Sequence, residues 1–159
     1  MAVNLNPARA LKSRWVRTEP DLPDRPRWYG GKILVAEDNL LLGDVVCDFL
    51  RECGLDPCGP FATVEQALAV ARTAALDGAV LDLKLGGNLC YPVCTALQAR
   101  GIPFVFLTGY VDLSMIPPEL TSTPLICKPF EANEMKAAIA AMVQLDERLY
   151  ATAPHASRH

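Results

Sequence analysis

The sequence predicts one α/β domain built on a doubly wound parallel sheet of five strands, with helices on both faces. The chain has 159 residues, a length that suits a single domain. Hydrophobic residues make up 51% of the chain and charged residues 21%, which is enough apolar surface for a packed core. From residue 32 onward, short apolar runs alternate with longer amphipathic stretches, as strands and helices do in a parallel sheet.

Five short apolar runs are predicted to be strands. The run at 33–36 is apolar on both faces, which is typical of a central strand that is covered on both sides. The run at 55–58 contains Pro57, which lacks a backbone N–H and therefore favours an edge position. The three remaining strands are expected at 79–83, 104–107 and 125–127.

Four helices are predicted between and after these strands. The first covers 40–52 and should stop at Gly54, and the second begins at Thr63, whose hydroxyl and Gln66 form a capping pattern. We expect Asp77-Gly78 to end this second helix. The other two helices are expected at 92–100 and 131–150. The residues predicted to face inward are Leu42, Val45, Val46, Phe49 and Leu50 in the first helix, Val64, Ala67, Leu68 and Ala71 in the second, and Met135, Ala138, Ile139, Met142 and Leu145 in the last.

The stretch at 110–123 has little periodicity and contains Pro117-Pro118. Because proline disrupts helical hydrogen bonding, any helix there should be short or irregular.

Charge divides the chain into a basic beginning and an acidic body. Residues 1–32 hold seven Lys or Arg against three acids, a charge of +4, and the remainder carries −7. We expect a basic N-terminal extension at 1–31, the folded domain at 32–150 and a frayed tail at 151–159. An acidic body argues against nucleic-acid binding by the domain.

The basic extension contains an apolar group, Leu11, Trp15 and Val16, which would form one stripe on a helix. Three prolines at 20, 23 and 26 interrupt regular structure before the domain. A flexible extension, a docking helix for this domain or a partner, and a contact with a membrane or nucleic acid all remain open.

The six cysteines show no C-x-x-C pair, so we expect reduced thiols rather than metal or redox chemistry. No apolar run reaches the length of a membrane helix and no signal peptide is visible, so the chain is expected to be soluble and cytoplasmic. The cysteines are Cys47, Cys53, Cys58, Cys90, Cys94 and Cys127, of which Cys47, Cys94 and Cys127 lie in apolar stretches.

Polar side chains stand where four of the predicted strands end. Glu37-Asp38 follow the first strand, Asp82 lies in the third, Thr108 follows the fourth and Lys128 the fifth. Ligands bind at this end of a doubly wound sheet, so we expect the five side chains to converge. Three neighbouring carboxylates repel one another unless a cation is present, and Mg²⁺ fits such a set of oxygen ligands.

A phosphoryl group suits the space between this metal site and Lys128. Asp82 is predicted to be the nucleophile, because a carboxylate can accept a phosphoryl group as an acyl phosphate. Thr108 could donate its hydroxyl to a phosphoryl oxygen, and Lys128 would supply positive charge from the opposite side.

The chain resembles the receiver domain of bacterial two-component response regulators over residues 32–150. Each motif alone is weak, but four occur in the family's order: Ile-Leu-Val-Ala-Glu-Asp-Asn at 33–39, Ala-Val-Leu-Asp at 79–82, Phe-Leu-Thr-Gly at 106–109, and Lys-Pro-Phe at 128–130.

This resemblance implies a flavodoxin-like sheet with strand order 2-1-3-4-5. It also implies that Asp82 is the phospho-acceptor, with Asp38 a direct Mg²⁺ ligand, Glu37 a ligand through water, and the carbonyl of Lys84 a further ligand. Thr108 would be the switch hydroxyl and Lys128 the phosphate-binding lysine. The family's Lys-Pro bond is usually cis, so a cis bond is predicted between Lys128 and Pro129.

The sequence departs from the family where the signal is passed on. Many receivers carry an aromatic residue three positions before the lysine, and this chain has Leu125 there. Tyr110 follows Thr108-Gly109, and these three residues resemble a Thr-Gly-Tyr motif of stand-alone receivers. Tyr110 either takes over the switch role or is a packing aromatic.

The predicted function is that of a single-domain response regulator, which catalyses only its own phosphorylation and dephosphorylation. It would take its phosphoryl group from a histidine kinase or histidine phosphotransfer protein. Output would be by protein contact, on the face of the last two strands and the last helix, or as a phosphate sink in a phosphorelay. No DNA-binding domain or transmembrane segment is expected, and the sequence does not decide between a monomer and a homodimer. The alternatives are a pseudo-receiver that is never phosphorylated and, with less support, an aspartate-based phosphohydrolase, which usually needs a second acid where Lys84 stands.

Overall fold

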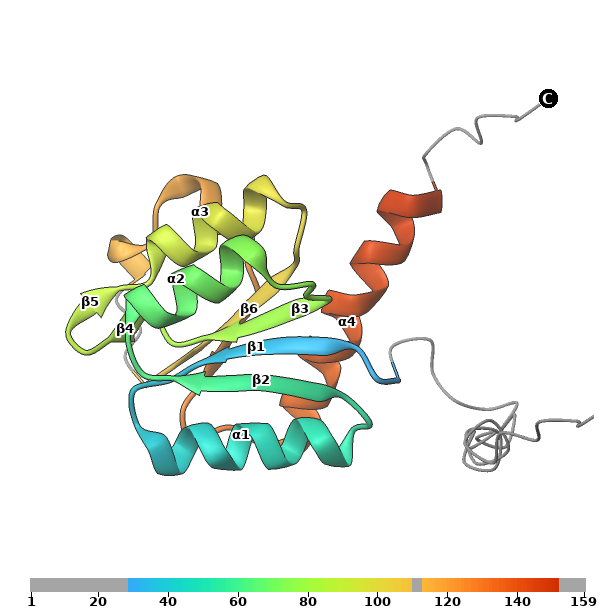
Figure 1. The fold of residues 1–159 in the computed structure, drawn as a ribbon, viewed down its shortest axis with the longest axis horizontal. Helices are drawn as coiled ribbons and strands as arrows, with labels where there is room; N and C mark the ends of the chain where they lie inside the picture. The colour runs from blue at the N-terminus through green and yellow to red at the C-terminus, as the bar shows by residue number, and fades with distance from the viewer. Residues whose placement is uncertain (1–28, 110–112, 152–159) are drawn as a thin grey trace, which may run out of the picture.

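The computed structural model describes residues 29–109 and 113–151, and they form one parallel sheet between two layers of helices (Figure 1). The strand order is β2-β1-β3-β6-β7, which is the predicted 2-1-3-4-5 order when the five strands of this sheet are counted alone. The strands are β1 Lys32–Ala36, β2 Asp56–Phe61, β3 Gly78–Leu81, β6 Phe104–Thr108 and β7 Leu125–Cys127.

Four α-helices cover the sheet, α2 and α3 on one face and α1 and α4 on the other (Figure 1). Two short 3-10 turns, η2 Leu113–Met115 and η3 Pro118–Leu120, lie between β6 and β7 and fit the irregular structure expected there. The helices are α1 Leu40–Glu52, α2 Val64–Thr73, α3 Tyr91–Ala99 and α4 Ala132–Ala151.

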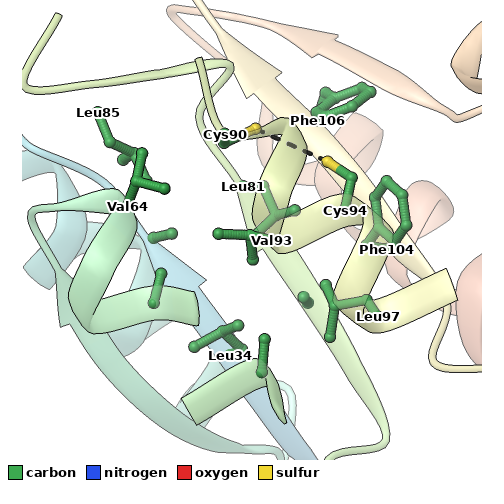
Figure 2. Packing of buried hydrophobic residues seen from close by; sticks show 14 of the residues in the cluster. Leu34, Val64, Leu81, Leu85, Cys90, Val93, Cys94, Leu97, Phe104 and Phe106 are labelled. Carbon is green, nitrogen blue, oxygen red and sulfur yellow. Dashed lines mark hydrogen bonds between the residues drawn. The ribbon is translucent and has the colours of Figure 1, made fainter. Parts of the chain in front are cut away.

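The buried side chains form two apolar clusters, one on each face of the sheet. Successive residues of a strand point to opposite faces, so Ile33 lies in the cluster under α1 and α4 and Leu34 in the cluster under α2 and α3. Figure 2 shows the second cluster, in which Val93 of α3 lies close to Leu81 of β3. Both faces of the central strands are covered, which explains their continuous apolar runs.

The second helix ends earlier than predicted. α2 stops at Thr73, because Ala74 adopts an extended backbone with ψ 148°, and Asp77-Gly78 do not end it. Gly78 instead begins β3, where a Cβ atom would lie 2.7 Å from Cε of Met142. Gly78 therefore lies in close contact with the side chain of Met142 on α4, a contact that its position in the sequence does not reveal.

The first helix matches its predicted bounds, with Asn39 as the N-cap and Gly54 beyond its end at a φ of 80°. The prediction that Val45 faces inward is wrong, since its side chain is 54% exposed. Cys47 is buried in its place. The stripe follows the helical period, and Val45 falls just outside the arc that contacts the sheet.

A short antiparallel hairpin follows β3 and was not predicted from the sequence. Its strands are β4 Lys84–Leu85 and β5 Asn88–Leu89, joined by Gly86 and Gly87. Both glycines have positive φ, 57° and 84°, as a two-residue hairpin turn requires. The predicted third strand at 79–83 therefore ends at Leu81, and the chain turns into this hairpin.

All six cysteines are free thiols, as predicted. Cys127 is exposed although it lies in an apolar run, because it ends an edge strand. None of the helices in the described part of the chain is both long and apolar enough to cross a membrane. Residues 1–28 of the basic extension, most of the predicted tail and Tyr110 lie outside the described residues.

Candidate functional site

Three carboxylates meet at the carboxyl ends of two neighbouring strands. Glu37 and Asp38 follow β1, and Asp82 follows β3, which pairs with β1. Glu37 and Asp82 are buried, whereas Asp38 is exposed. One carboxylate oxygen from each residue lies within 4.8 Å of the others. The structure thus brings together the three acids that were predicted from the sequence to converge at the strand ends.

Backbone hydrogen bonds fix the two buried acids at the ends of their strands. The N–H of Asp82 donates to the carbonyl of Ala36 at 2.9 Å, and the N–H of Glu37 donates to that of Phe61 at 2.9 Å. These bonds continue the ladders of β1 beyond its last residue. They hold both carboxylates at a position set by the sheet rather than by a free loop.

The carboxylate oxygens also accept backbone hydrogen bonds from the loops around them. Asp38 Oδ2 accepts from the N–H of Gly86 at 3.0 Å, which ties the exposed acid to the β4–β5 hairpin. Asp82 Oδ1 accepts from the N–H of Lys84 at 3.2 Å, and Glu37 Oε1 from that of Asn39 at 3.0 Å. The hairpin therefore orients two of the three acids.

Lys128 links two of the acids. Its Nζ lies 2.5 Å from Oε2 of Glu37 and 2.7 Å from Oδ2 of Asp82. The backbone N–H of Lys128 donates to the carbonyl of Thr108 at 2.9 Å, which sets the lysine at the end of β7. The peptide bond between Lys128 and Pro129 is cis, as predicted, and a second cis bond, Gly59-Pro60, was not predicted.

Burial and pairing act on the charges of this group in opposite directions. Burial raises the pKa of the Glu37 carboxyl, and the hydrogen bond from Lys128 offsets part of that increase. Burial alone would lower the pKa of Lys128, but its hydrogen bonds to Asp82 and Glu37 outweigh burial, so its pKa is raised. Lys128 therefore stays an ammonium ion at neutral pH.

A pocket of about 270 Å³ opens beside these charges. Asp38, Asp82, Thr108 and Lys128 line its polar side, and Thr108 is buried at the end of β6. The other side is apolar, and the hydroxyl of Tyr91 there donates to the carbonyl of Met115. The apolar wall consists of Leu83, Leu89, Tyr91 and Met115.

Some proteins of known structure are similar to this chain. No family model matches the chain. The chain is 37% identical to SdrG from Sphingomonas melonis Fr1, whose solved structure superposes with a TM-score of 0.64 over 72% of this chain and 98% of SdrG. It is also 27% identical over 116 residues to the transcriptional regulatory protein BaeR of Escherichia coli O6:H1, covering 71% of this chain and 48% of BaeR. It therefore spans about half the length of that curated relative.

The chain belongs to the receiver domains of response regulators. The fold agrees with that of a third protein, the receiver domain of the sensor histidine kinase PA1611 from Pseudomonas aeruginosa PAO1. The two superpose with a TM-score of 0.63 at 22% identity, over 72% of this chain and 98% of the other. That structure holds a magnesium ion coordinated in its active site cleft.

Three further residues of this receiver domain were considered in the sequence, namely Lys84, Leu125 and Tyr110. Lys84 is exposed and lines the pocket, and its backbone N–H contacts Asp82. Leu125 lies in β7, half-buried, where many receivers carry an aromatic residue. Tyr110 lies outside the described residues, so its switch role stays a prediction.

Sequence reasoning missed the apolar wall of the pocket. Tyr91 begins α3 directly after the hairpin, and Leu89 belongs to the hairpin itself. The pair Gly86-Gly87 between Leu85 and Asn88 is a hairpin signal that could have been recognised in the sequence. No comparable signal points to Met115, which reaches the pocket from an irregular segment.

Proposed function

We propose that this receiver domain accepts a phosphoryl group on Asp82 and signals through protein contact. The observation that carries the proposal is the position of Asp82, which lies beside two further acids, pairs with Lys128 at 2.7 Å, and lines an open pocket. A carboxylate in this position has a cation on one side and room for a tetrahedral group on the other.

The donor set fits Mg²⁺, because three carboxylate oxygens within 4.8 Å of one another form a hard, anionic site. We propose Asp38 and Asp82 as direct ligands, Glu37 as a ligand through water, and the backbone carbonyl of Lys84 as a further ligand. When bound there, Mg²⁺ would neutralise the charge on the phosphoryl oxygens. The magnesium ion of the PA1611 receiver domain supports this proposal by analogy of fold.

Phosphotransfer would form a bond between one Asp82 oxygen and the phosphorus while the bond from phosphorus to the donor breaks. With a phosphohistidine donor, the imidazole nitrogen leaves with the electron pair of the P–N bond. Lys128 would exchange its contact with Asp82 for a phosphoryl oxygen and keep its contact with Glu37. Thr108 would donate its hydroxyl to another phosphoryl oxygen, which couples β6 to the state of Asp82.

The expected donor is a histidine kinase or a histidine phosphotransfer protein. Residues 32–150 would act as a stand-alone receiver that binds a target or drains phosphoryl groups from a relay, and a homodimer stays open. The near-complete coverage of the SdrG chain supports this proposal. The face formed by β6, β7 and α4 is the proposed output surface, because Thr108 and Lys128 lie at the ends of these two strands.

The test uses acetyl phosphate as a small phosphodonor, with Mg²⁺ present, and reads the intact mass of the protein. The wild-type chain should gain one phosphoryl group, and Asp82→Asn should gain none. Omitting Mg²⁺ should prevent the gain in the wild type, because three unscreened carboxylates repel the donor.

Three results would contradict the proposal. An Asp82→Asn variant that is phosphorylated as fast as the wild type would place the acceptor elsewhere. A wild type that binds Mg²⁺ but gains no mass, either from acetyl phosphate or from a panel of histidine kinases, would favour a pseudo-receiver. Release of phosphate in large excess over protein would instead indicate a phosphohydrolase.

A further inference from the structure

The outer face of α1 is unusually apolar for a surface. The described residues include five large hydrophobic side chains that are exposed, and three of them lie on this helix. Leu40 is 60% exposed, Leu41 80% and Val45 54%. Leu41 and Val45 are four residues apart, so their side chains are neighbours on the same side of the helix.

The same face is acidic. Asp44, Asp48 and Glu52 are exposed and recur every four residues, so they form a row next to Leu41 and Val45. Arg51 is the one basic residue of α1, and it already pairs with Asp48 at 2.7 Å. A segment that suits this face must therefore combine apolar side chains with positive charge.

The N-terminal part of this chain contains such a segment. Residues 9–17 carry four basic residues and no acid. Leu11 and Trp15 are four residues apart, the same spacing as Leu41 and Val45 on α1. The basic residues are Arg9, Lys12, Arg14 and Arg17.

The first described residues of the chain lie beside this helix. The first described residues lie at the C-terminal end of α1, where the N–H of Gly30 donates to the carbonyl of Gly54 at 2.6 Å. Tyr29 packs on the same glycine, since a Cβ atom on Gly54 would lie 2.5 Å from the ring of Tyr29. The chain therefore arrives directly at the end of the helix that carries the exposed face.

The connecting residues are long enough. α1 has 13 residues and is about 20 Å long at the usual rise of an α-helix. Residues 18–28 can span up to roughly 36 Å when extended. Segment 9–17 can therefore reach any part of the face between Glu52 and Leu40.

We propose that segment 9–17 docks on the face of α1 formed by Leu41, Val45 and the acidic row, within the same chain. Leu11 and Trp15 cover the two aliphatic side chains, and the basic residues lie against Asp44, Asp48 and Glu52. This contact is an interaction surface beyond the proposed phosphotransfer and does not depend on it.

The environment of Trp15 tests the proposal in the full chain. Trp28→Phe leaves Trp15 as the single tryptophan, and acrylamide quenching then reports how exposed its ring is. The quenching constant should rise about twofold when Leu41→Gln and Val45→Gln are added, because undocking exposes the shielded face of the indole ring. Salt should produce a similar rise, since the charged contacts are at the surface.

The matched control is Ala69→Gln, at an exposed position on α2 on the opposite face of the sheet, which should leave quenching unchanged. Quenching that is insensitive to the two α1 substitutions would overturn the proposal, because Trp15 would then be free or docked elsewhere, with the α1 face left for a partner protein. Protection that appears only as protein concentration rises would also overturn it and would identify a second copy as the occupant.

Discussion

At the scale of single residues, Lys128 decides whether the acidic group is compatible with a folded domain. A buried carboxylate is costly unless it is paired and hydrogen-bonded. Lys128 contacts Glu37 and Asp82 at once, and no buried side-chain nitrogen or oxygen among the described residues lacks a hydrogen-bond partner. Lys128 therefore compensates the charges of the two buried carboxylates before any metal or phosphoryl group binds.

Replacing Lys128 with glutamine should lower stability in Mg²⁺-free buffer by about 2–3 kcal/mol, because two buried carboxylates lose their counter-charge. Urea unfolding with a chelator present measures the loss. Saturating Mg²⁺ should recover part of it, since the metal binds the folded state alone.

The control for this prediction is Lys136→Gln, at an exposed position on α4, which should change stability by less than about 0.5 kcal/mol. Equal effects of the two substitutions would show that the bridge from Lys128 adds nothing to stability.

At the scale of elements, Gly86 in the hairpin turn and Gly59 in β2 are subject to different constraints. Gly86 has a φ of 57° with no atom near its missing Cβ, so its constraint is backbone conformation alone. Gly59 in β2 has a φ of 133°, and a Cβ there would lie 2.4 Å from the carbonyl oxygen of Val35. The second position is limited by contact with the neighbouring strand as well.

Gly86→Ala should therefore cost about 1 kcal/mol, the usual penalty for a left-handed residue, and Gly86→Asn should cost less, because asparagine tolerates that region. Gly59→Ala should cost clearly more than Gly86→Ala, since β2 must move away from β1. Urea unfolding of the three variants ranks them. A Gly59→Ala loss no larger than that of Gly86→Ala would contradict the contact.

Most elements were predictable because one physical signal dominated each of them. The strand at 125–127 and the helix at 40–52 have the predicted bounds, since apolar runs and helical spacing were unambiguous there. The hairpin at 84–89 was missed because its strands are too short to show alternation. The end of α2 was misplaced because Asp77-Gly78 resembles a helix stop, whereas α2 ends at Thr73 and Gly78 begins β3.

The site was predictable for a different reason. Parallel strands align their carboxyl ends, so Glu37, Asp82 and Lys128 had to converge whatever the details of the loops. The bridge from Lys128 to both acids depends on side-chain geometry, which spacing alone does not supply. The apolar wall around Tyr91 depends on the hairpin and was missed with it.

At the scale of the whole molecule, the sheet joins two apolar clusters into one cooperative unit. Ile33 and Leu34 are adjacent in β1 and fully buried, yet they belong to different clusters. Because β1 contributes side chains to both clusters, loss of packing on one face of the sheet should also destabilise the cluster on the other face.

Ile33→Ala and Leu34→Ala should each lower the free energy of unfolding by about 2–5 kcal/mol, because each leaves a cavity in a packed core. Both variants should unfold in a single transition, seen at the same urea concentration by circular dichroism and by methyl NMR. Leu41→Ala, at a side chain that is 80% exposed, should cost far less. Separate transitions for the two faces would show that the clusters are independent.

The two outer strands of the sheet have a consequence for self-association. β2 contains Pro57 and Pro60, which offer no N–H to an incoming strand, and β7 at the opposite edge has three residues. Exposed strand edges are the usual templates for aggregation, and short or proline-containing edges blunt them. Growth of this sheet by strand addition is therefore disfavoured at both sides, which protects the protein against fibril-like assembly when it is concentrated.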